Sequence, residues 1–183
     1  MPFKYYGGVH PDYAKTASKT PVRTISPPPV VVLPMIQQIG APNKPVVKVG
    51  DTVKMGQLIG SNDAPVSAPV HSSVSGKVIA VEPRRHMLGD MVMSVVIEND
   101  FQDTPCEDMK PLSEEQLKDP DAIIARIREA GVVGMGGAMF PTAFKIQGAR
   151  GKVDTVIING AECEPYLCGD HRTMLEHPED LLK

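Results

Sequence analysis

Short aliphatic runs separated by turn residues fill the middle of the chain, and this spacing predicts a small β-rich module. The runs are Val30–Leu33, Val46–Val49, Gln57–Ile59, Val74–Val81 and Met91–Ile97. Glycine- and aspartate-containing turns separate them, as in small sandwiches and barrels. Alternation along the runs places Lys48, Lys77 and Glu82 outward, around a core of aliphatic side chains.

The periodicity changes from strand-like to helical after residue 118. Asp119 and Pro120 have the composition of a helix N-cap and first helical position. Apolar residues then recur on one helix face: Ile123, Ile124, Ile127 and Ala130. Gly131 ends this helix, and Ser113 with Gln116 forms a possible capping box for a short helix before it.

The last fifty residues read as an α/β segment. A glycine-rich loop and a helix come first, followed by a strand over Thr155–Ile158, a sharp loop over Asn159–Cys168, and a helix from about Asp170. His177–Asp180 looks like the start of one more helix. We therefore expect the sequence to be a fragment of a longer protein.

Composition divides the chain into four stretches. We expect an extended, proline-rich arm at 1–29, the β module at 30–100, an acidic linker at 101–118, and an α/β domain at 119–183. The fold class is therefore mixed, or α+β.

Charge and cysteine content exclude several classes of protein. The 183 residues carry a formal charge of −3 with mixed signs, which argues against nucleic acid as a partner. No apolar run is long enough to span a bilayer, and the first residues lack a signal-peptide core. Three cysteines cannot form a disulfide framework, so we expect a reducing, cytoplasmic compartment.

The β module resembles the biotinyl- and lipoyl-type barrel-sandwich hybrid. The resemblance rests on Val46–Ile59, Ala68–Val70 and Ser75–Val78, where glycines turn corners and allow close approach of the half-sheets. Carriers with this fold need a lysine at the tip between the two halves. Here the tip is 61–67 and has no lysine, so we expect a docking or structural module that is not a carrier.

The glycine-rich loop is a candidate anion site. Gly134, Gly136 and Gly137 precede Lys145, and such loops let backbone amides converge on a phosphate while a lysine supplies charge. The loop lacks the Gly-Lys-Ser/Thr ending of a P-loop, and it follows a helix where a dinucleotide fingerprint follows a strand. A tight structural turn is the alternative.

A second loop, Asn159–Tyr166, follows the expected strand at its carboxyl end, where α/β sheets usually bind ligands. Its amide and two carboxylates could grip flavin or ribose hydroxyls, or the loop could simply be held by Asx-type turns. Cys163, Cys168 and His171 resemble part of a metal site without a fourth ligand, and we expect no metal there.

The two loops together resemble those of the flavin- and NADH-binding subunit of respiratory complex I. With Gly7–Pro11 in the arm and the lipoyl-like module ahead, the chain resembles the C subunits of the Rnf electron-transport complex over essentially its whole length. The resemblance implies an FMN phosphate cradle, further flavin contacts and NADH contacts. The FMN phosphate cradle would consist of Gly134, Gly136, Gly137 and Lys145. The further flavin contacts would be Asn159 and Glu162, and the NADH contacts would be Phe140 and Glu164. Two positions depart from the pattern: Met139 stands where a glycine is usual, and Ala161 where the complex I relatives have aspartate.

The function that the resemblance implies is electron transport. The intact protein would be a peripheral subunit on the cytoplasmic side of a membrane-bound, ion-translocating NADH:ferredoxin oxidoreductase, with the other Rnf subunits as partners. Electrons would pass from NADH through FMN to 4Fe–4S clusters that lie outside this sequence, and no side chain here is expected to be catalytic. The fragment alone is expected to be inactive. The alternatives are a similar protein that feeds a soluble reductase, and a docking module with a degenerate flavin fold.

Overall fold

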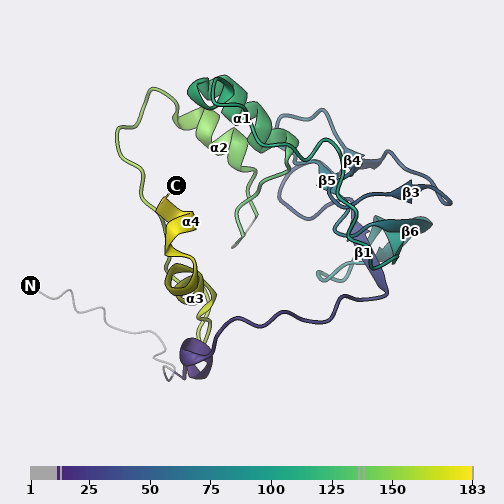
Figure 1. Ribbon diagram of the computed structural model, residues 1–183, viewed down its shortest axis with the longest axis horizontal. Helices are drawn as coiled ribbons and strands as arrows, with labels where there is room; N and C mark the ends of the chain where they lie inside the picture. The colour runs from purple at the N-terminus through teal and green to yellow at the C-terminus, as the bar shows by residue number, and fades with distance from the viewer. Residues whose placement is uncertain (1–11, 13, 136, 138, 183) are drawn as a thin grey trace, which may run out of the picture. The chain divides into compact units, whose positions relative to one another are not determined.

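The computed structural model describes residues 12, 14–135, 137 and 139–182, so Gly136 and the arm motif Gly7–Pro11 lie outside the described residues. The chain divides into two compact units (Figure 1). One, here the barrel unit, is Ser26–Asp154. The other, the arm unit, joins the N-terminal segment up to Ile25 with Thr155–Lys183.

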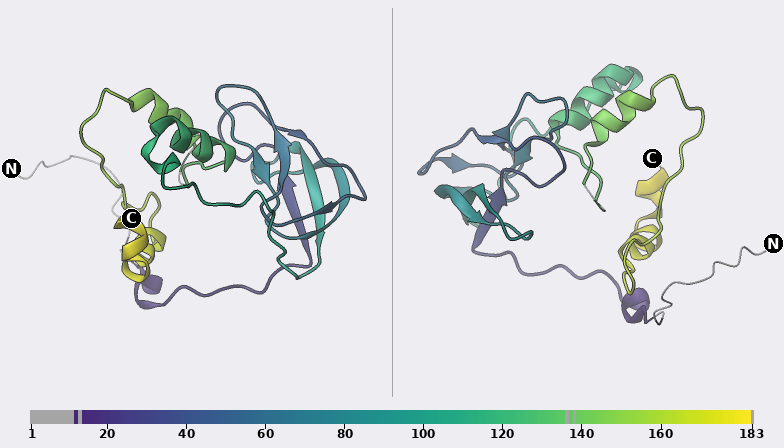
Figure 2. Two further views of the ribbon diagram at one scale, coloured as in Figure 1. Left: turned by 45° about the horizontal axis from the view of Figure 1, so that its top comes forward. Right: turned by 180° about the vertical axis from the view of Figure 1, so that it is seen from behind.

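Two antiparallel sheets form the β module of the barrel unit. The larger sheet has the order β1-β7-β6-β3, and its strands are β1 (Val30–Pro34), β7 (Met91–Asn99), β6 (Gly76–Arg85) and β3 (Thr52–Val53). The smaller sheet has the order β2-β4-β5 and contains β2 (Lys44–Pro45), β4 (Leu58–Ser61) and β5 (Val70–His71). Its strands lie beside those of the larger sheet in the left view of Figure 2.

The core of the β module is aliphatic, as the sequence predicts. Its buried members are Met35, Val53, Ile59, Val70, Val74, Val78, Val95 and Ile97. Lys48, Lys77 and Glu82 are exposed, so their predicted outward placement is confirmed. At Gly76 (φ +155°) a Cβ would collide with the Glu98 carbonyl, so the close approach of β6 and β7 requires glycine.

Four of the five strands predicted for the β module are confirmed, and the strand expected at Val46–Val49 is wrong. The strand in this part of the chain is β2, Lys44–Pro45, which ends just before that run. The Lys48 amide donates to the Asp51 carboxylate at 3.0 Å, and the Gly50 amide donates to the Val78 carbonyl at 2.8 Å. These two bonds hold the end of the run where the chain enters a turn, so the run does not continue as a paired strand.

The acidic stretch after the barrel packs along the β module. The Met55 amide donates to the Thr104 carbonyl at 2.9 Å, and the Cys106 amide donates to the Met55 carbonyl at 2.8 Å. Lys54 pairs with Glu107 at 2.8 Å, which raises the pKa of the lysine and lowers the pKa of the carboxyl. The domain boundaries expected from composition stay a prediction.

Helices follow where the sequence predicts them. The reciprocal bonds of the Ser113–Gln116 capping box are present before the 3₁₀ turn η2 (Gln116–Lys118). Asp119 caps α1 (Pro120–Glu129) by accepting from the Asp121 amide at 2.9 Å. Helix α2 (Thr142–Ala149) packs beside α1 (Figure 1), and Arg150 forms an ion pair with Asp121.

The arm unit contains the 3₁₀ turn η1 (Thr16–Lys19) and the helices α3 (Gly169–Glu176) and α4 (Pro178–Leu182). The strand expected at Thr155–Ile158 is wrong: this segment has no regular secondary structure, and Val156, Ile157 and Ile158 are 82%, 85% and 69% exposed. A strand persists only when a neighbour accepts its hydrogen bonds, and within the described part of the chain no strand pairs with it.

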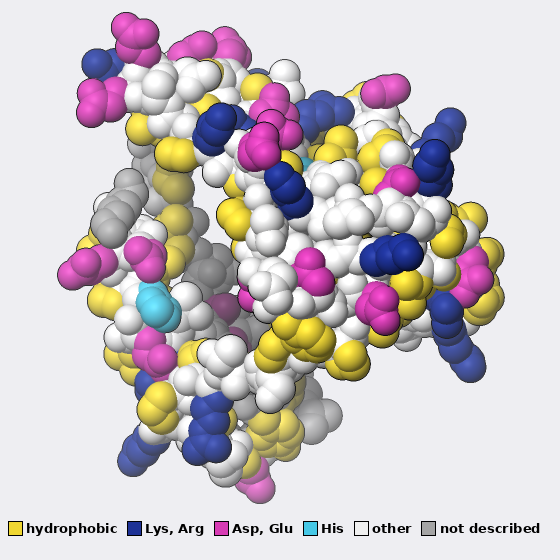
Figure 3. Space-filling view, turned by 45° about the vertical axis from the view of Figure 1, so that its right-hand side comes forward, with side chains coloured by type: hydrophobic (Ala, Val, Ile, Leu, Met, Phe, Trp, Pro, Cys, Tyr) yellow, Lys and Arg dark blue, Asp and Glu magenta, His cyan; other side chains and the backbone are white. Residues whose placement is uncertain are grey.

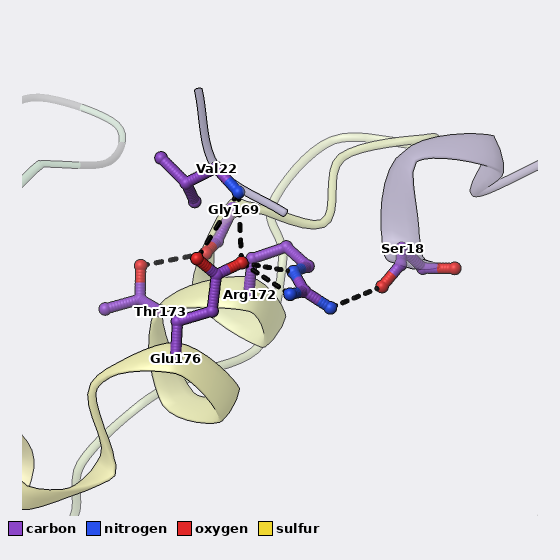
Figure 4. Close-up of polar contacts among 6 residues, drawn as sticks. All are labelled: Ser18, Val22, Gly169, Arg172, Thr173 and Glu176. Atoms are coloured by element: carbon purple, nitrogen blue, oxygen red, sulfur yellow. Dashed lines mark hydrogen bonds and ion pairs between the residues drawn. The ribbon is translucent and has the colours of Figure 1, made fainter. Parts of the chain in front are cut away.

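An arginine–glutamate pair fastens the arm to α3 (Figure 4). Arg172 donates through Nε to Glu176 at 2.8 Å and through Nη1 to the Ser18 carbonyl at 3.1 Å. The Glu176 carboxylate also accepts from the Val22 amide at 3.0 Å. These bonds lower the pKa of Glu176, chiefly through the arginine. The bonds from this pair to Ser18 and Val22 were not predicted from the sequence.

Candidate functional site

The glycine-rich loop of the barrel unit has its two ends tied together. The Gly134 amide donates to the Phe140 carbonyl at 3.0 Å, and the Thr142 amide donates to the Val132 carbonyl at 3.0 Å. Val133 and Pro141 form an antiparallel bridge between these bonds. The loop therefore stands on a fixed base and leads directly into α2.

Two described residues of the loop have left-handed backbone. Gly137 has φ +60°, and apart from its two chain neighbours no described residue lies within 4 Å of the position that a Cβ would occupy there. Met139 has φ +51°, a conformation that favours glycine. The predicted departure from the glycine pattern at Met139 therefore coincides with a strained backbone, while the space beside Gly137 stays open.

Lys145 and Phe140 lie close to this loop. Lys145 is exposed in the first half of α2, whose N-terminus has no side-chain cap. Phe140 is half-buried and packs edge-to-face against Phe144, with ring centroids 5.9 Å apart. An uncapped helix end beside an open glycine loop and a lysine is an arrangement that suits a phosphate group.

A cavity of about 270 Å³ separates the loop from the β module. Met139 and Val133 line it from the loop, Gly131 from the end of α1, and His71 and Gln38 from the β module. His71 also lines a second cavity of about 490 Å³, with Arg126 and Asp108 among its walls. Burial lowers the pKa of His71, which favours the neutral form of the imidazole between the two cavities.

The acidic loop belongs to the arm unit and is held by local bonds. Asn159 Oδ1 accepts from the Ala161 amide at 2.9 Å, which makes an Asx-type turn. Glu162 is half-buried and accepts from the His171 amide at 3.1 Å, at the start of α3. Glu164 is exposed. The structure therefore places Asn159, Glu162 and Glu164 on one loop, in a different unit from Gly134, Gly137, Phe140 and Lys145.

The cysteines and histidine of this loop do not gather into a ligand set. Cys163 is exposed and Cys168 is buried. Across the described residues, no three His, Cys, Asp or Glu side chains are placed to hold a metal ion. Helices long and apolar enough to cross a membrane are likewise missing from residues 14–135 and 139–182.

The loop that carries the lysine in lipoyl proteins is fastened in this chain. Arg128 of α1 donates to the Ala64 carbonyl at 3.0 Å. Within the loop, Asn62 bonds to the Ala64 amide and to the Pro42 carbonyl, both at 2.6 Å. None of these three bonds was predicted, because backbone donors and acceptors leave no mark in a residue pattern.

Comparison with known proteins supplies two family matches. The family model for the RnfC barrel sandwich hybrid domain matches residues 3–102, and that for the Nuo51 FMN-binding domain matches residues 127–183. Both halves of the resemblance drawn from the motifs are thereby confirmed.

Several curated relatives align with nearly the whole chain. The C subunit of the Na(+)-translocating ferredoxin:NAD(+) oxidoreductase complex of Acetobacterium woodii is 49% identical over 180 residues, 97% of this chain and 41% of the relative. The proton-translocating counterpart of Clostridium ljungdahlii is 44% identical over 181 residues, 97% and 39%. The C subunit of the ion-translocating oxidoreductase complex of Serratia proteamaculans is 39% identical over 180 residues, 97% and 25%. The chain thus spans about two fifths or less of these relatives.

Proposed function

The chain belongs to the RnfC family, and on that premise we propose that it contributes the barrel and the first part of the flavin site of an electron-transporting subunit. The whole subunit would work in an ion-translocating NADH:ferredoxin oxidoreductase, peripheral to the membrane on its cytoplasmic side. Its partners would be the other subunits of that complex, NADH, and ferredoxin through the complex. The names of the relatives support this assignment.

The glycine loop carries the proposal. Its base is fixed by two backbone bonds, and apart from its chain neighbours no described residue fills the space beside Gly137. The uncapped end of α2 follows with Lys145. We assign Gly134, Gly136, Gly137 and Lys145 to the FMN phosphate, with Gly136 lying outside the described residues. Backbone amides and the lysine charge would hold the phosphate in place.

The remaining contacts are assigned to the acidic loop and to Phe140. Asn159 and Glu162 would hold the flavin, and Phe140 and Glu164 would face NADH. FMN when bound supplies the hydride and one-electron chemistry, while the protein positions and orients the reactants. Iron–sulfur clusters of the 4Fe–4S type would be carried by parts of the full-length protein outside this sequence.

Lysine substitutions test the phosphate assignment in the full-length subunit. Replacing Lys145 by methionine removes a charge-assisted contact, so we expect the Kd for FMN to rise about tenfold or more. The Kd for riboflavin, which lacks the phosphate, should stay within about twofold. Fluorescence quenching of both ligands measures these constants.

Lys152→Met is the matched control, because Lys152 is a lysine of the same region whose Nζ donates to the Gly148 carbonyl at 3.0 Å. It should leave both constants unchanged. An equal loss of FMN and riboflavin affinity in Lys145→Met would contradict the phosphate role.

A docking module with a degenerate flavin fold is the second candidate, and the strained Met139 favours it. The substitution Met139→Gly separates the two. If the full-length wild-type subunit does not quench flavin fluorescence and the glycine variant does, the degenerate fold is the better description.

A further inference from the structure

The β6–β7 hairpin extends beyond the sheet to which it belongs. Strand β1 pairs only with Ser94–Glu98 of β7, and β3 pairs only with Gly76 and Lys77 of β6. The far end, Pro83–Arg85 with Met91–Met93, is a two-stranded ribbon that no other strand of the described chain joins. At its base the Met93 carbonyl accepts from the Met35 amide at 2.8 Å. Its turn is closed by the His86 amide, which donates to the Asp90 carbonyl at 2.7 Å.

Hydrophobic side chains cover this extension. Met87 and Leu88 in the turn are 91% and 82% exposed, and Met91 and Met93 on β7 are 64% and 41% exposed. Val95 lies on the same face of β7 as these two methionines, because residues two apart on a strand share a face, and it is fully buried in the core. The core-facing side of β7 therefore continues past the barrel with no part of the described chain fully covering it.

An apolar cavity lies next to the exposed ribbon. Its volume is about 570 Å³, and its walls include Val92 and Met93 of the hairpin and Met35, Ile36, Pro42 and Pro45 of the barrel. The uncovered surface thus runs from the hairpin turn onto the barrel itself. Apolar surface of this kind marks interaction sites in soluble proteins.

The charges of the extension have mixed signs. Arg84 pairs with Glu82 at 2.7 Å, Asp90 lies in the turn, and Arg85 has no ion pair with any described residue. The face drawn in Figure 3 likewise intersperses acidic and basic side chains. Arg85 is therefore a cation available to a partner.

We propose that the hairpin extension, residues 83–93, inserts into an apolar groove edged by a carboxylate on another protein subunit of the complex. Methionine side chains adapt to irregular grooves, and Arg85 matches the carboxylate. A lipid surface fits less well, because membrane-interface segments use aromatic anchors and clusters of about four to eight Lys or Arg residues. This hairpin has no Trp, Tyr or Phe, and its basic residues are Arg84, which is paired with Glu82, Arg85 and His86. The inference rests on the proposed function, since it requires a multi-subunit complex.

Photo-crosslinking in the assembled complex tests the proposal. A photoreactive amino acid replaces Leu88 in the full-length subunit, and a second variant carries it at Val49, a 59% exposed residue on a different turn of the barrel. We expect position 88 to crosslink to a protein subunit at a yield at least about tenfold above position 49. Crosslinks mainly to lipid, or equal yields at both positions, would overturn the proposal.

Charge substitutions give an independent readout. Met91→Glu should lower the recovery of other subunits with the tagged protein about tenfold or more, as for loss of an interface hot spot. Val49→Glu should leave recovery unchanged. The FMN content of the purified subunit should be unchanged in both variants, so the flavin assignment is tested separately. Normal recovery with Met91→Glu in a folded protein would overturn the docking role.

Discussion

Met139 shows how a single side chain can oppose the backbone that its loop requires. Its φ of +51° lies where a Cβ is costly, and the neighbouring loop residue Gly137 meets the same demand with glycine. The left-handed conformation costs a non-glycine residue about 1–2 kcal/mol. Glycine avoids this cost, but part of the gain is lost because glycine has more conformational entropy in the unfolded chain.

Replacing Met139 by glycine should therefore stabilise the protein by about 0.5 kcal/mol. Chemical denaturation followed by circular dichroism measures the change. Met135 is the matched control, because it is 89% exposed in the same loop without a positive φ. Met135→Gly should not raise the free energy of unfolding. If it raised this free energy as much as Met139→Gly does, backbone strain at Met139 would not be the cause.

His71 predicts a pH dependence with a definite sign. Burial lowers its pKa in the folded protein below the ordinary value of 6.5. When pH falls through 6.5 the unfolded chain takes up a proton that the folded chain resists, so stability decreases toward acid. His71→Gln should remove this part of the slope between about pH 7.5 and 5. Urea unfolding at several pH values tests it, and identical slopes in both proteins would count against it.

Among the elements, those with local signals were predictable from the sequence. A few neighbouring residues specify each of these elements, which are the N-cap at Asp119, the capping box at Ser113 and the strands β1, β4, β6 and β7. The expected strand at Thr155–Ile158 failed because a strand also needs a partner, and periodicity says nothing of whether one is present. The candidate site residues were named from motifs, and the Asx-type turn at Asn159 was an alternative that the sequence offered. The bond from the His171 amide to Glu162 was not predicted, because a backbone donor leaves no mark in a residue pattern.

The attachment of the arm to α3 is an element-scale feature that the i,i+4 spacing of Arg172 and Glu176 only half reveals. Glu176→Ala removes the acceptor for Val22 and the partner of Arg172. We expect hydrogen exchange in residues 16–25 to become about two- to fivefold faster, in line with the modest contribution of a partly buried ion pair near the surface. Glu179→Ala on α4 is the control and should leave this segment unchanged.

Acid should have the same effect as this substitution. The folded pKa of Glu176 is lowered, so its contribution is present above the ordinary value of 4.5 and is lost as pH falls through the folded pKa. Exchange rates in the arm that do not change with pH below 4.5, after correction for intrinsic chemistry, would contradict this prediction.

For the whole molecule, the proposed flavin residues are divided between two units. Val156, Ile157 and Ile158, just before the acidic loop, are exposed and unpaired with any described strand, so ordering that loop around a ligand costs conformational entropy. We therefore expect this 183-residue chain to bind FMN at least about tenfold more weakly than the full-length subunit. Equilibrium titration compares the two proteins, and NADH oxidation by the short chain at the full-length rate would disprove the expectation.

The bond from Arg128 to the Ala64 carbonyl has a mechanical consequence. A lipoyl carrier works because its modified lysine swings between distant active sites. In this barrel the equivalent tip is hydrogen-bonded to a helix of the same unit, so a lysine introduced at Asp63 would have a smaller range of movement than the lysine of a carrier.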